Sequence, residues 1–124
     1  MAIITFFFDT YAFFELVEGN PNYLPYTEHV GIITTKLNLM ELHYGLMRDY
    51  DEEIANTLFD ELRQFCIEID DKTIREANIF RLQNYKRELS HVDCIGYTLA
   101  KQRGVKFLSG DTQFESFENV EFVK

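Results

Sequence analysis

The strongest constraint on the fold is one uninterrupted run, residues 3–8, which ends at an acid and a hydroxyl, Asp9 and Thr10. Every residue of the run is β-branched or aromatic, and the polar alternation of a half-exposed strand is missing. Such a run is typical of a strand buried on both faces. Ligands of open α/β sheets bind at the carboxyl ends of the strands, so Asp9 is the first candidate functional residue. The structural alternative is that Asp9 caps a following helix.

The rest of the chain alternates between strand and helix patterns. Short apolar runs predict strands, and apolar residues three and four apart predict amphipathic helices. The predicted strands are residues 3–8, 30–34, 66–69, 105–109 and 120–123, and the predicted helices are residues 10–18, 36–50, 51–65, 74–87 and 94–103. This alternation predicts an α/β fold with a mostly parallel sheet, in a single domain over residues 1–124.

The charge narrows the class of function. The formal charge of −9 argues against a general nucleic-acid binder held by phosphate neutralisation. It leaves open an enzyme that meets phosphates through a bound metal, since several acids could be metal ligands.

The two cysteines and the apolar runs indicate the compartment. Cys66 and Cys94 lack CxxC spacing, which predicts neither a zinc site nor a disulfide framework. Because no apolar run is long enough to span a membrane, we expect a soluble protein in the reducing cytoplasm.

A carboxylate interrupts the helix predicted over residues 36–50. Glu41 lies within an apolar stripe. The stripe consists of Leu37, Met40, Tyr44 and Met47, and Leu39, Leu42 and Leu46 lie beside it. A carboxylate on an apolar face is costly unless it is paired or binds a cation. Glu41 is therefore a candidate metal ligand, and pairing with Lys36 or Lys101 is the structural alternative.

Two further acids stand beside the fourth predicted strand, residues 105–109. Asp111 follows that strand, again beside a hydroxyl. Asp93 opens the helix that leads into the strand, and the pattern Ser90-x-x-Asp93 is also that of a capping box. Asp111 thus repeats the arrangement at Asp9, whereas Asp93 has a ready structural explanation.

The four acids meet if the strand order reverses between the first and fourth strands, because Asp9 and Asp111 then flank one crevice. Asp93 and Glu41 lie on helices near the same edge. Converging carboxylates repel one another and raise their own pKa values, and a divalent cation removes that repulsion. An oxygen-only set favours Mg²⁺ or Mn²⁺ over zinc. Such a site is a common platform for phosphoryl chemistry.

The chain resembles PIN-domain proteins, and particularly the small VapC-like toxins of prokaryotes. The resemblance covers nearly the whole chain and rests on four segments in a specific order. They are FDT at residues 8–10, LMELHYGL around Glu41, HVDCIGYTLAKQRGVKFLSGD with Asp93 and Asp111, and DTQF with Phe114.

This resemblance implies a three-layer α/β/α fold with a sheet of four to five strands. It implies a Mg²⁺- or Mn²⁺-dependent ribonuclease acting on RNA, often a homodimer and often silenced by an antitoxin. By position, the family's acidic quartet falls on Asp9, Glu41, Asp93 and Asp111. Thr10 and Ser109 fall on hydroxyl positions that help to orient the carboxylates or a water.

The hypothesis that follows gives each acid a role. Asp9 and Asp111 hold the metal directly or through water, and Asp93 shares that metal or a second one. Glu41 orients or deprotonates the water that hydrolyses the RNA phosphodiester.

Other functions fit parts of the sequence. A phosphatase of the haloacid dehalogenase type needs Asp-x-Asp, but Tyr11 occupies the second acidic position. A receiver domain needs an acidic pair at the first strand and a phosphoacceptor after the third, where only Asp70 or Asp71 comes close. A PIN-like binding or scaffold module is the stronger alternative, although a scaffold has no need to retain four costly acids.

No segment of the sequence carries a readable code for the RNA target, and DNA remains a second substrate class. The helix predicted over residues 74–87 has a basic face, formed by Arg75, Arg81, Lys86 and Arg87. A solvated surface explains this face most simply, and contact with an RNA backbone is the alternative. The aromatic residues of loop 22–29 either line a groove or cover the core.

Overall fold

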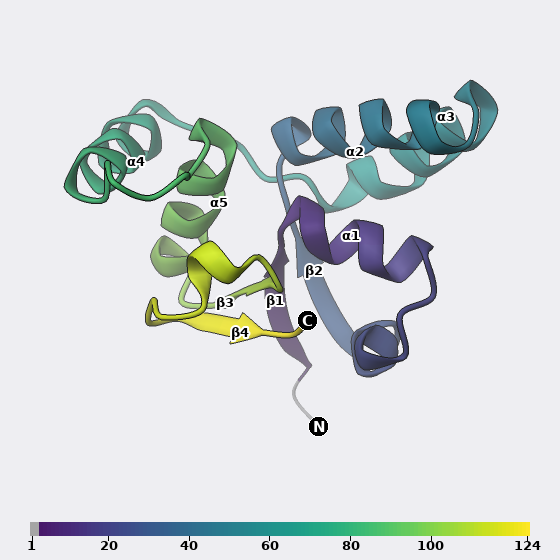
Figure 1. Ribbon diagram of the computed structural model, residues 1–124, viewed down its shortest axis with the longest axis horizontal. Coiled ribbons are helices and arrows are strands. Elements are labelled where there is room, and N and C mark those ends of the chain that lie inside the picture. The colour runs from purple at the N-terminus through teal and green to yellow at the C-terminus, as the bar shows by residue number, and fades with distance from the viewer. Residues whose placement is uncertain (1–2) are drawn as a thin grey trace.

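A parallel sheet of four strands forms the centre of the molecule (Figure 1). The computed structural model describes residues 3–124, and its strands are β1 (Ile4–Phe8), β2 (Val30–Ile33), β3 (Lys106–Ser109) and β4 (Val120–Phe122). Their order is β2-β1-β3-β4, and every neighbouring pair is parallel. The apolar run at the start of the chain is therefore a central strand, and the strand order reverses between β1 and β3 as predicted.

Helices cover both faces of the sheet, which confirms the three-layer α/β/α fold (Figure 1). One face carries α1 (Thr10–Val17), α2 (Lys36–Asp49) and α3 (Glu52–Leu62), and the other carries α4 (Asp71–Gln83) and α5 (His91–Gln102). Side chains alternate along a strand, so Phe6 and Phe8 pack with α1 and α2 while Phe7 packs with α5. Within residues 3–124, no helix is both long enough and apolar enough to cross a membrane.

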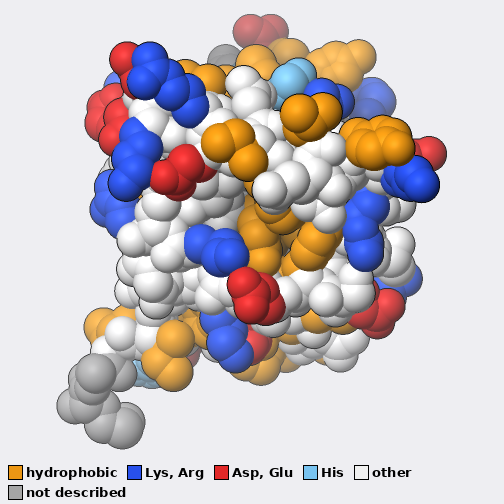
Figure 2. All heavy atoms as spheres, turned by 90° about the vertical axis from the view of Figure 1, so that its left-hand side faces the viewer, with side chains coloured by type: hydrophobic (Ala, Val, Ile, Leu, Met, Phe, Trp, Pro, Cys, Tyr) orange, Lys and Arg blue, Asp and Glu red, His pale blue; other side chains and the backbone are white. Residues whose placement is uncertain are grey.

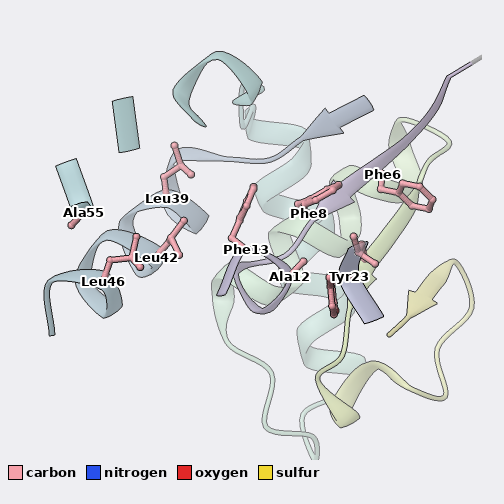
Figure 3. Close-up of a cluster of buried hydrophobic side chains, with 10 residues drawn as sticks. Phe6, Phe8, Ala12, Phe13, Tyr23, Leu39, Leu42, Leu46 and Ala55 are labelled. Carbon is pink, nitrogen blue, oxygen red and sulfur yellow. The ribbon is translucent and has the colours of Figure 1, made fainter. Parts of the chain in front are cut away.

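The core on the α1–α3 side consists of large apolar side chains from the sheet and the helices (Figure 3). Phe8 of β1 meets Phe13 of α1 with ring centroids 5.4 Å apart, and Leu39 and Leu42 of α2 belong to the same cluster. Complete burial of each such side chain contributes roughly 1.5–3 kcal/mol. This packing fixes α2, and with it Glu41, relative to the end of β1.

Aromatic rings dominate the core on the α4–α5 side. Phe7 and Phe107 stack across the β1–β3 pair with ring centroids 5.7 Å apart, and Tyr97 of α5 meets Phe107 edge-on. Gly96 allows this close approach, because a Cβ there would lie 2.8 Å from the Phe7 ring and 3.1 Å from the Phe107 ring. The packing of α5 thereby also positions Asp93, three residues earlier.

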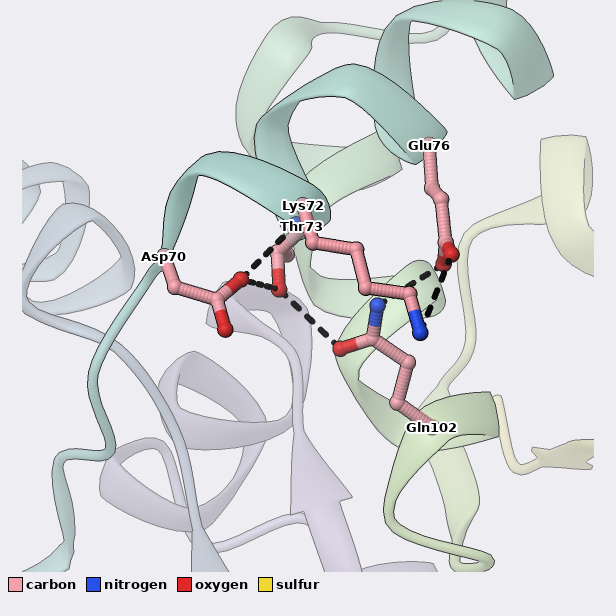
Figure 4. A network of polar contacts seen from close by, with 5 residues as sticks. All are labelled: Asp70, Lys72, Thr73, Glu76 and Gln102. Carbon is pink, nitrogen blue, oxygen red and sulfur yellow. Dashed lines mark hydrogen bonds and ion pairs between the residues drawn. The ribbon is translucent and has the colours of Figure 1, made fainter.

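A polar network joins the start of α4 to the end of α5 (Figure 4). Asp70 caps α4 by accepting a hydrogen bond from the Thr73 N–H (2.8 Å), and the Thr73 hydroxyl lies 3.0 Å from Gln102 Oε1. Gln102 Nε2 in turn donates to Glu76 Oε2 (2.8 Å). The two helices are therefore antiparallel, so the C-terminal end of α4 lies beside the N-terminal end of α5.

The prediction of a strand over residues 66–69 is wrong. Only Cys66 pairs, in a single parallel bridge with Thr34, whose backbone makes both hydrogen bonds of the bridge. The pairing ends there because Thr35, directly after Thr34, already caps α2, and the 3-10 helix Arg63–Phe65 directly precedes Cys66. The sheet therefore has four strands, within the expected four to five.

The Tyr- and Pro-rich segment before β2 is a short 3-10 helix, Pro21–Tyr26. Its Tyr23 side chain is fully buried, and the hydroxyl donates to Val123 O (2.6 Å). Of the two alternatives for this segment, the structure shows the one in which it covers the core.

The apolar stripe predicted on α2 is not the buried face of that helix. Met40 and Tyr44 are 55% and 62% exposed. The apolar side chains of α2 that are buried are Leu39, Leu42 and Leu46. Two adjacent faces of α2 are apolar, and packing against α1 and α3 selects one of them. Glu41 is half-buried at the border between the two faces.

Candidate active site

Two of the four predicted acids follow adjacent strands at the carboxyl edge of the sheet. Asp9 directly follows β1, and its backbone N–H donates to Leu108 O of β3 (3.1 Å). Asp111 lies two residues after β3 and accepts a hydrogen bond from the Gln113 N–H (2.9 Å). Because β1 and β3 are parallel neighbours, both acids lie where the strand order reverses.

Asp9 occupies the N-cap position of α1, but its side chain makes no capping hydrogen bond. Its Oδ2 instead accepts a hydrogen bond from Ser109 Oγ (2.9 Å), and that hydroxyl accepts one from the Asp111 N–H (3.1 Å). Ser109 thus links the two acids across the β1–β3 pair. With Asp9 only 3% exposed, helix capping does not explain why a carboxylate is buried here.

Asp93 lies in the first turn of α5, where the predicted capping box is present. Ser90 Oγ accepts from the Asp93 N–H (3.0 Å), and Asp93 Oδ2 accepts from the Ser90 N–H (2.9 Å). Within the described chain, the capping box uses one carboxylate oxygen of Asp93 and leaves Oδ1 for another partner. Capping and a role in the site are therefore compatible at this residue.

Glu41 reaches the site through Thr10, whose hydroxyl donates to Glu41 Oε1 (2.7 Å). The pairing with Lys101 that would have explained this acid is absent, because Lys101 instead contacts Glu118 (3.0 Å). Lys36, the other candidate, makes no salt bridge among residues 3–124. Glu41 is therefore held by the residue that follows Asp9.

Two buried polar residues that the sequence analysis did not single out support this contact. Asn38 Nδ2 donates to Thr10 Oγ1 (3.1 Å), and Asn38 Oδ1 accepts from Thr35 Oγ1 (2.7 Å). Thr35 and Asn38 are both fully buried. Hydrogen bonds therefore run from the start of α2 through Asn38 and Thr10 to Glu41. A polar residue inside the buried face of an amphipathic helix was the available signal for Asn38.

The electrostatics show that the four acids influence one another. Burial and the neighbouring Asp93 charge raise the pKa of Asp9 to about 8, while the hydrogen bond from Ser109 acts in the opposite direction. Burial also raises the pKa of Asp93, and the charges of Asp111 and Glu41 add to the effect. Like-charge repulsion between these carboxylates thus disfavours the ionised forms of Asp9 and Asp93.

No Lys, Arg or His within residues 3–124 forms a salt bridge with any of these four acids. Their donor set consists of carboxylate and hydroxyl oxygens, which suits a hard divalent cation. In the same residues, no three His, Cys, Asp or Glu side chains are close enough to form a ready-made metal site. The chemistry of the donors thus fits a divalent metal, although the side chains do not form a closed ligand cage.

Comparison with known proteins supports the same assignment of the fold. The family model of the PIN domain matches residues 6–120. VapC20 of Mycobacterium tuberculosis, a toxin that cleaves the sarcin–ricin loop, has a TM-score of 0.80 at 18% identity, covering 96% of this chain and 99% of its own. Among curated proteins, none matches this chain.

Two solved toxin–antitoxin complexes are also similar. A complex from Klebsiella pneumoniae has a TM-score of 0.73 at 19% identity, covering 92% of this chain and 93% of its own. DNA-bound VapBC from Salmonella typhimurium has a TM-score of 0.70 at 16% identity, covering 96% of both chains. At these identities the likeness concerns the fold.

Proposed function

Because the chain belongs to the PIN domain family, which matches it over residues 6–120, we propose that it is a metal-dependent ribonuclease of the VapC toxin type. One observation carries the proposal. Asp9 is buried beside Asp93, with neither a capping role nor a cationic partner in the described chain. A site that accepts a divalent cation explains that arrangement better than a structural carboxylate does.

The residues that would hold Mg²⁺ or Mn²⁺ are Asp9, Asp93, Asp111 and Glu41. When bound, such a metal supplies Lewis-acid chemistry, polarising a phosphate oxygen and easing attack by water. The protein's own contribution is to hold the carboxylates in place. Ser109 fixes Asp9, and Thr10 fixes Glu41, each through one hydrogen bond.

Glu41 is the proposed acceptor of the proton from the attacking water. Thr10 uses only Oε1 of its carboxylate, and the hydrogen bonds of residues 3–124 leave Oε2 without a donor. That oxygen is therefore available to orient a water and take its proton during attack on the phosphodiester.

The partners are part of the same proposal. The Klebsiella and Salmonella relatives are toxin–antitoxin complexes, which supports an antitoxin as a protein partner here. We extend the proposal to a homodimer and to the cytoplasm, where the free thiols of Cys66 and Cys94 remain reduced. Size-exclusion chromatography with light scattering tests the homodimer directly.

The decisive test is cleavage of a single-stranded RNA pool with EDTA, Mg²⁺ or Mn²⁺. We expect metal-dependent hydrolysis that Asp9→Asn and Asp93→Asn abolish and that Glu41→Gln slows by about 10²–10⁴-fold. Asp60→Asn, an exposed acid on α3, is the matched control and retains activity. Full cleavage by both Asp9→Asn and Asp93→Asn would refute the proposal. A parallel assay on single-stranded DNA decides between the two nucleic acids.

A PIN-like binding or scaffold module without catalysis is the second candidate. The observation in its favour is that no three metal-ligating side chains converge within residues 3–124. Mn²⁺ binding without cleavage of any RNA would favour this candidate over the nuclease.

A further inference from the structure

A surface pocket of about 300 Å³ lies at the C-terminal end of α4, outside the acidic site. Its lining residues are Asn78, Arg81, Leu82, Tyr85, Arg87 and Leu89. Figure 2 shows the α4–α5 side of the molecule, where Lys and Arg side chains lie among exposed hydrophobic side chains and a few Asp and Glu side chains. The pocket lies at α4, and the basic face of this helix has no role in the function proposed above.

The two arginines that line this pocket and the adjacent Lys86 are not neutralised by carboxylates. Arg81, Lys86 and Arg87 take part in none of the salt bridges of residues 3–124. Arg81 donates to Leu89 O (3.1 Å), a neutral acceptor that leaves its charge uncompensated. In a chain with a formal charge of −9, this is a local surface that attracts anions.

Hydrogen bonds link Arg81 to Asp93 through residues 89 and 90. Its acceptor, Leu89, directly precedes Ser90, and Ser90 makes both hydrogen bonds of the capping box with Asp93. The antiparallel packing of α4 on α5 explains this neighbourhood, because it sets the end of α4 beside the start of α5.

Arg87 is linked by hydrogen bonds to Asp111, on the β3 side of the acidic site. It donates to Gln113 O (3.0 Å), and the Gln113 N–H donates to Asp111 Oδ1 (2.9 Å). The Arg87 guanidinium also donates to Ser116 Oγ (2.9 Å) and stacks on Phe117, with its centre 4.5 Å from the ring centroid. Both arginines are thus positioned groups beside the acids, not freely moving surface side chains.

An aromatic ring completes the pocket. The Tyr85 side chain is 71% exposed at its rim, and the neighbouring Leu82 is also exposed. Proteins that bind single-stranded nucleic acid combine cations along the backbone with exposed aromatic rings on which bases stack. The carboxylates of an acidic protein segment would contact the cations, whereas a nucleotide offers both a phosphate for the cations and a flat base for the ring.

We propose that this pocket binds a nucleotide of a single-stranded RNA beside the scissile phosphate. Arg81 and Arg87 contact backbone phosphates, Lys86 adds attraction, and a base stacks on Tyr85. The inference rests on the proposed ribonuclease function and adds the path of the substrate strand, which runs from the acids across the ends of α5 and α4.

The test measures binding of a short fluorescent single-stranded RNA by anisotropy in EDTA, where cleavage does not interfere. The double variant Arg81→Gln/Arg87→Gln is expected to weaken binding by at least about tenfold at low salt. It is also expected to reduce the slope of log K against log salt by about 1.4, since each phosphate contact on a single strand contributes about 0.7. The control is Arg63→Gln/Arg103→Gln, which removes the same charge at exposed positions outside the pocket and leaves the slope unchanged.

Variants of Tyr85 distinguish the contribution of base stacking from that of charge to RNA binding. Tyr85→Ala is expected to weaken RNA binding by about tenfold without changing the salt slope, and Tyr85→Phe is expected to bind like the wild type. Lys86→Gln breaks no hydrogen bond of the described residues and is expected to lower the slope by about 0.7. Thermal unfolding of each variant confirms that the fold is intact.

Three results would overturn the inference. The first is a double variant that behaves like its control, and the second is no RNA binding by the wild type in EDTA. The third is poly-L-glutamate binding as tightly as RNA with no effect of Tyr85→Ala, which would assign the pocket to an acidic protein. Binding that depends on the arginines, without cleavage in Mn²⁺, would refute the nuclease alone. Cleavage with binding that is independent of the arginines would refute only this pocket.

Discussion

Thr10 shows how much of the site depends on a single hydroxyl, since it donates to Glu41 and accepts from Asn38. Thr10→Val keeps the shape but leaves the Asn38 amide without its acceptor, at a cost of about 1–3 kcal/mol in the free energy of unfolding. We expect RNA cleavage to fall by at least about tenfold, because Glu41 loses the group that orients it. Urea unfolding and single-turnover cleavage measure the two effects. Thr10→Ser is the control, and a Ser variant as inactive as Val would contradict the positioning role.

The raised pKa of Asp9 predicts how the free energy of unfolding depends on pH when no metal is bound. Its pKa in the folded protein, about 8, lies above its ordinary value of 3.8. Between these values the folded state keeps a proton that the unfolded chain has lost. The free energy of unfolding should therefore be highest near the lower value and should fall as pH rises towards 8, by up to about 1.4 kcal/mol per pH unit.

Urea unfolding in EDTA across this pH range measures the slope. Asp9→Asn removes the titrating group and should flatten it, leaving a smaller slope of the same sign from Asp93, whose pKa is also raised. An unchanged slope in Asp9→Asn would mean that this carboxylate is not the one being desolvated.

Two of the candidate acids stand out in the sequence because they break a local pattern. Asp9 ends an apolar run, and Glu41 interrupts an apolar stripe. Asn38 was missed because one amide in a helix is unremarkable until its neighbours are known. Its partner Thr10 is 28 residues away, and only tertiary packing brings the two together.

At the scale of elements, Gly96 sets the distance between α5 and the sheet. Gly96→Ala gains about 1 kcal/mol of helix propensity, but the added methyl meets the buried ring of Phe7 at 2.8 Å. Overpacking of a close-packed core costs about 1–3 kcal/mol, so we expect net destabilisation.

Urea unfolding of Gly96→Ala measures the sum of these two terms. Gly45→Ala is the comparison, because its methyl meets the far end of the ring of Phe14, which is only half-buried. Gly96→Ala that is more stable than the wild type would show that the core is not tightly packed at this point.

Elements that the sequence analysis misjudged share one cause. Residues 66–69 have the apolar composition of a strand, but the partner strand ends at Thr34, because Thr35 already caps α2, and only one bridge forms. The stripe containing Met40 and Tyr44 has helical spacing, but the burial of Leu39 and Leu42 depends on which face α1 and α3 contact. Local pattern identifies the type of element, whereas its length and orientation depend on its neighbours.

For the whole molecule, a metal that binds the folded state alone should raise the unfolding temperature by mass action. Mn²⁺ at about 100 times its Kd would add about 2.7 kcal/mol, which is a shift of several degrees for a chain of this size. Thermal unfolding with EDTA or Mn²⁺ measures it. Asp93→Asn should reduce the shift and Asp60→Asn should not. An equal shift in Asp93→Asn would place the metal elsewhere.

The hydrogen bond between Ser109 and Asp9 joins residues 100 positions apart. β1 is synthesised before its partner β3 and Asp111, which follow only after the five α-helices α1 to α5. Pairing over so long a separation is slow to form, because the loop must close before any contact rewards it. A nascent chain that has not yet reached residue 93 therefore contains Asp9 and Glu41 but lacks the other two acids of the site. Timing of synthesis alone keeps the acidic site unassembled until at least residue 111 has left the exit tunnel.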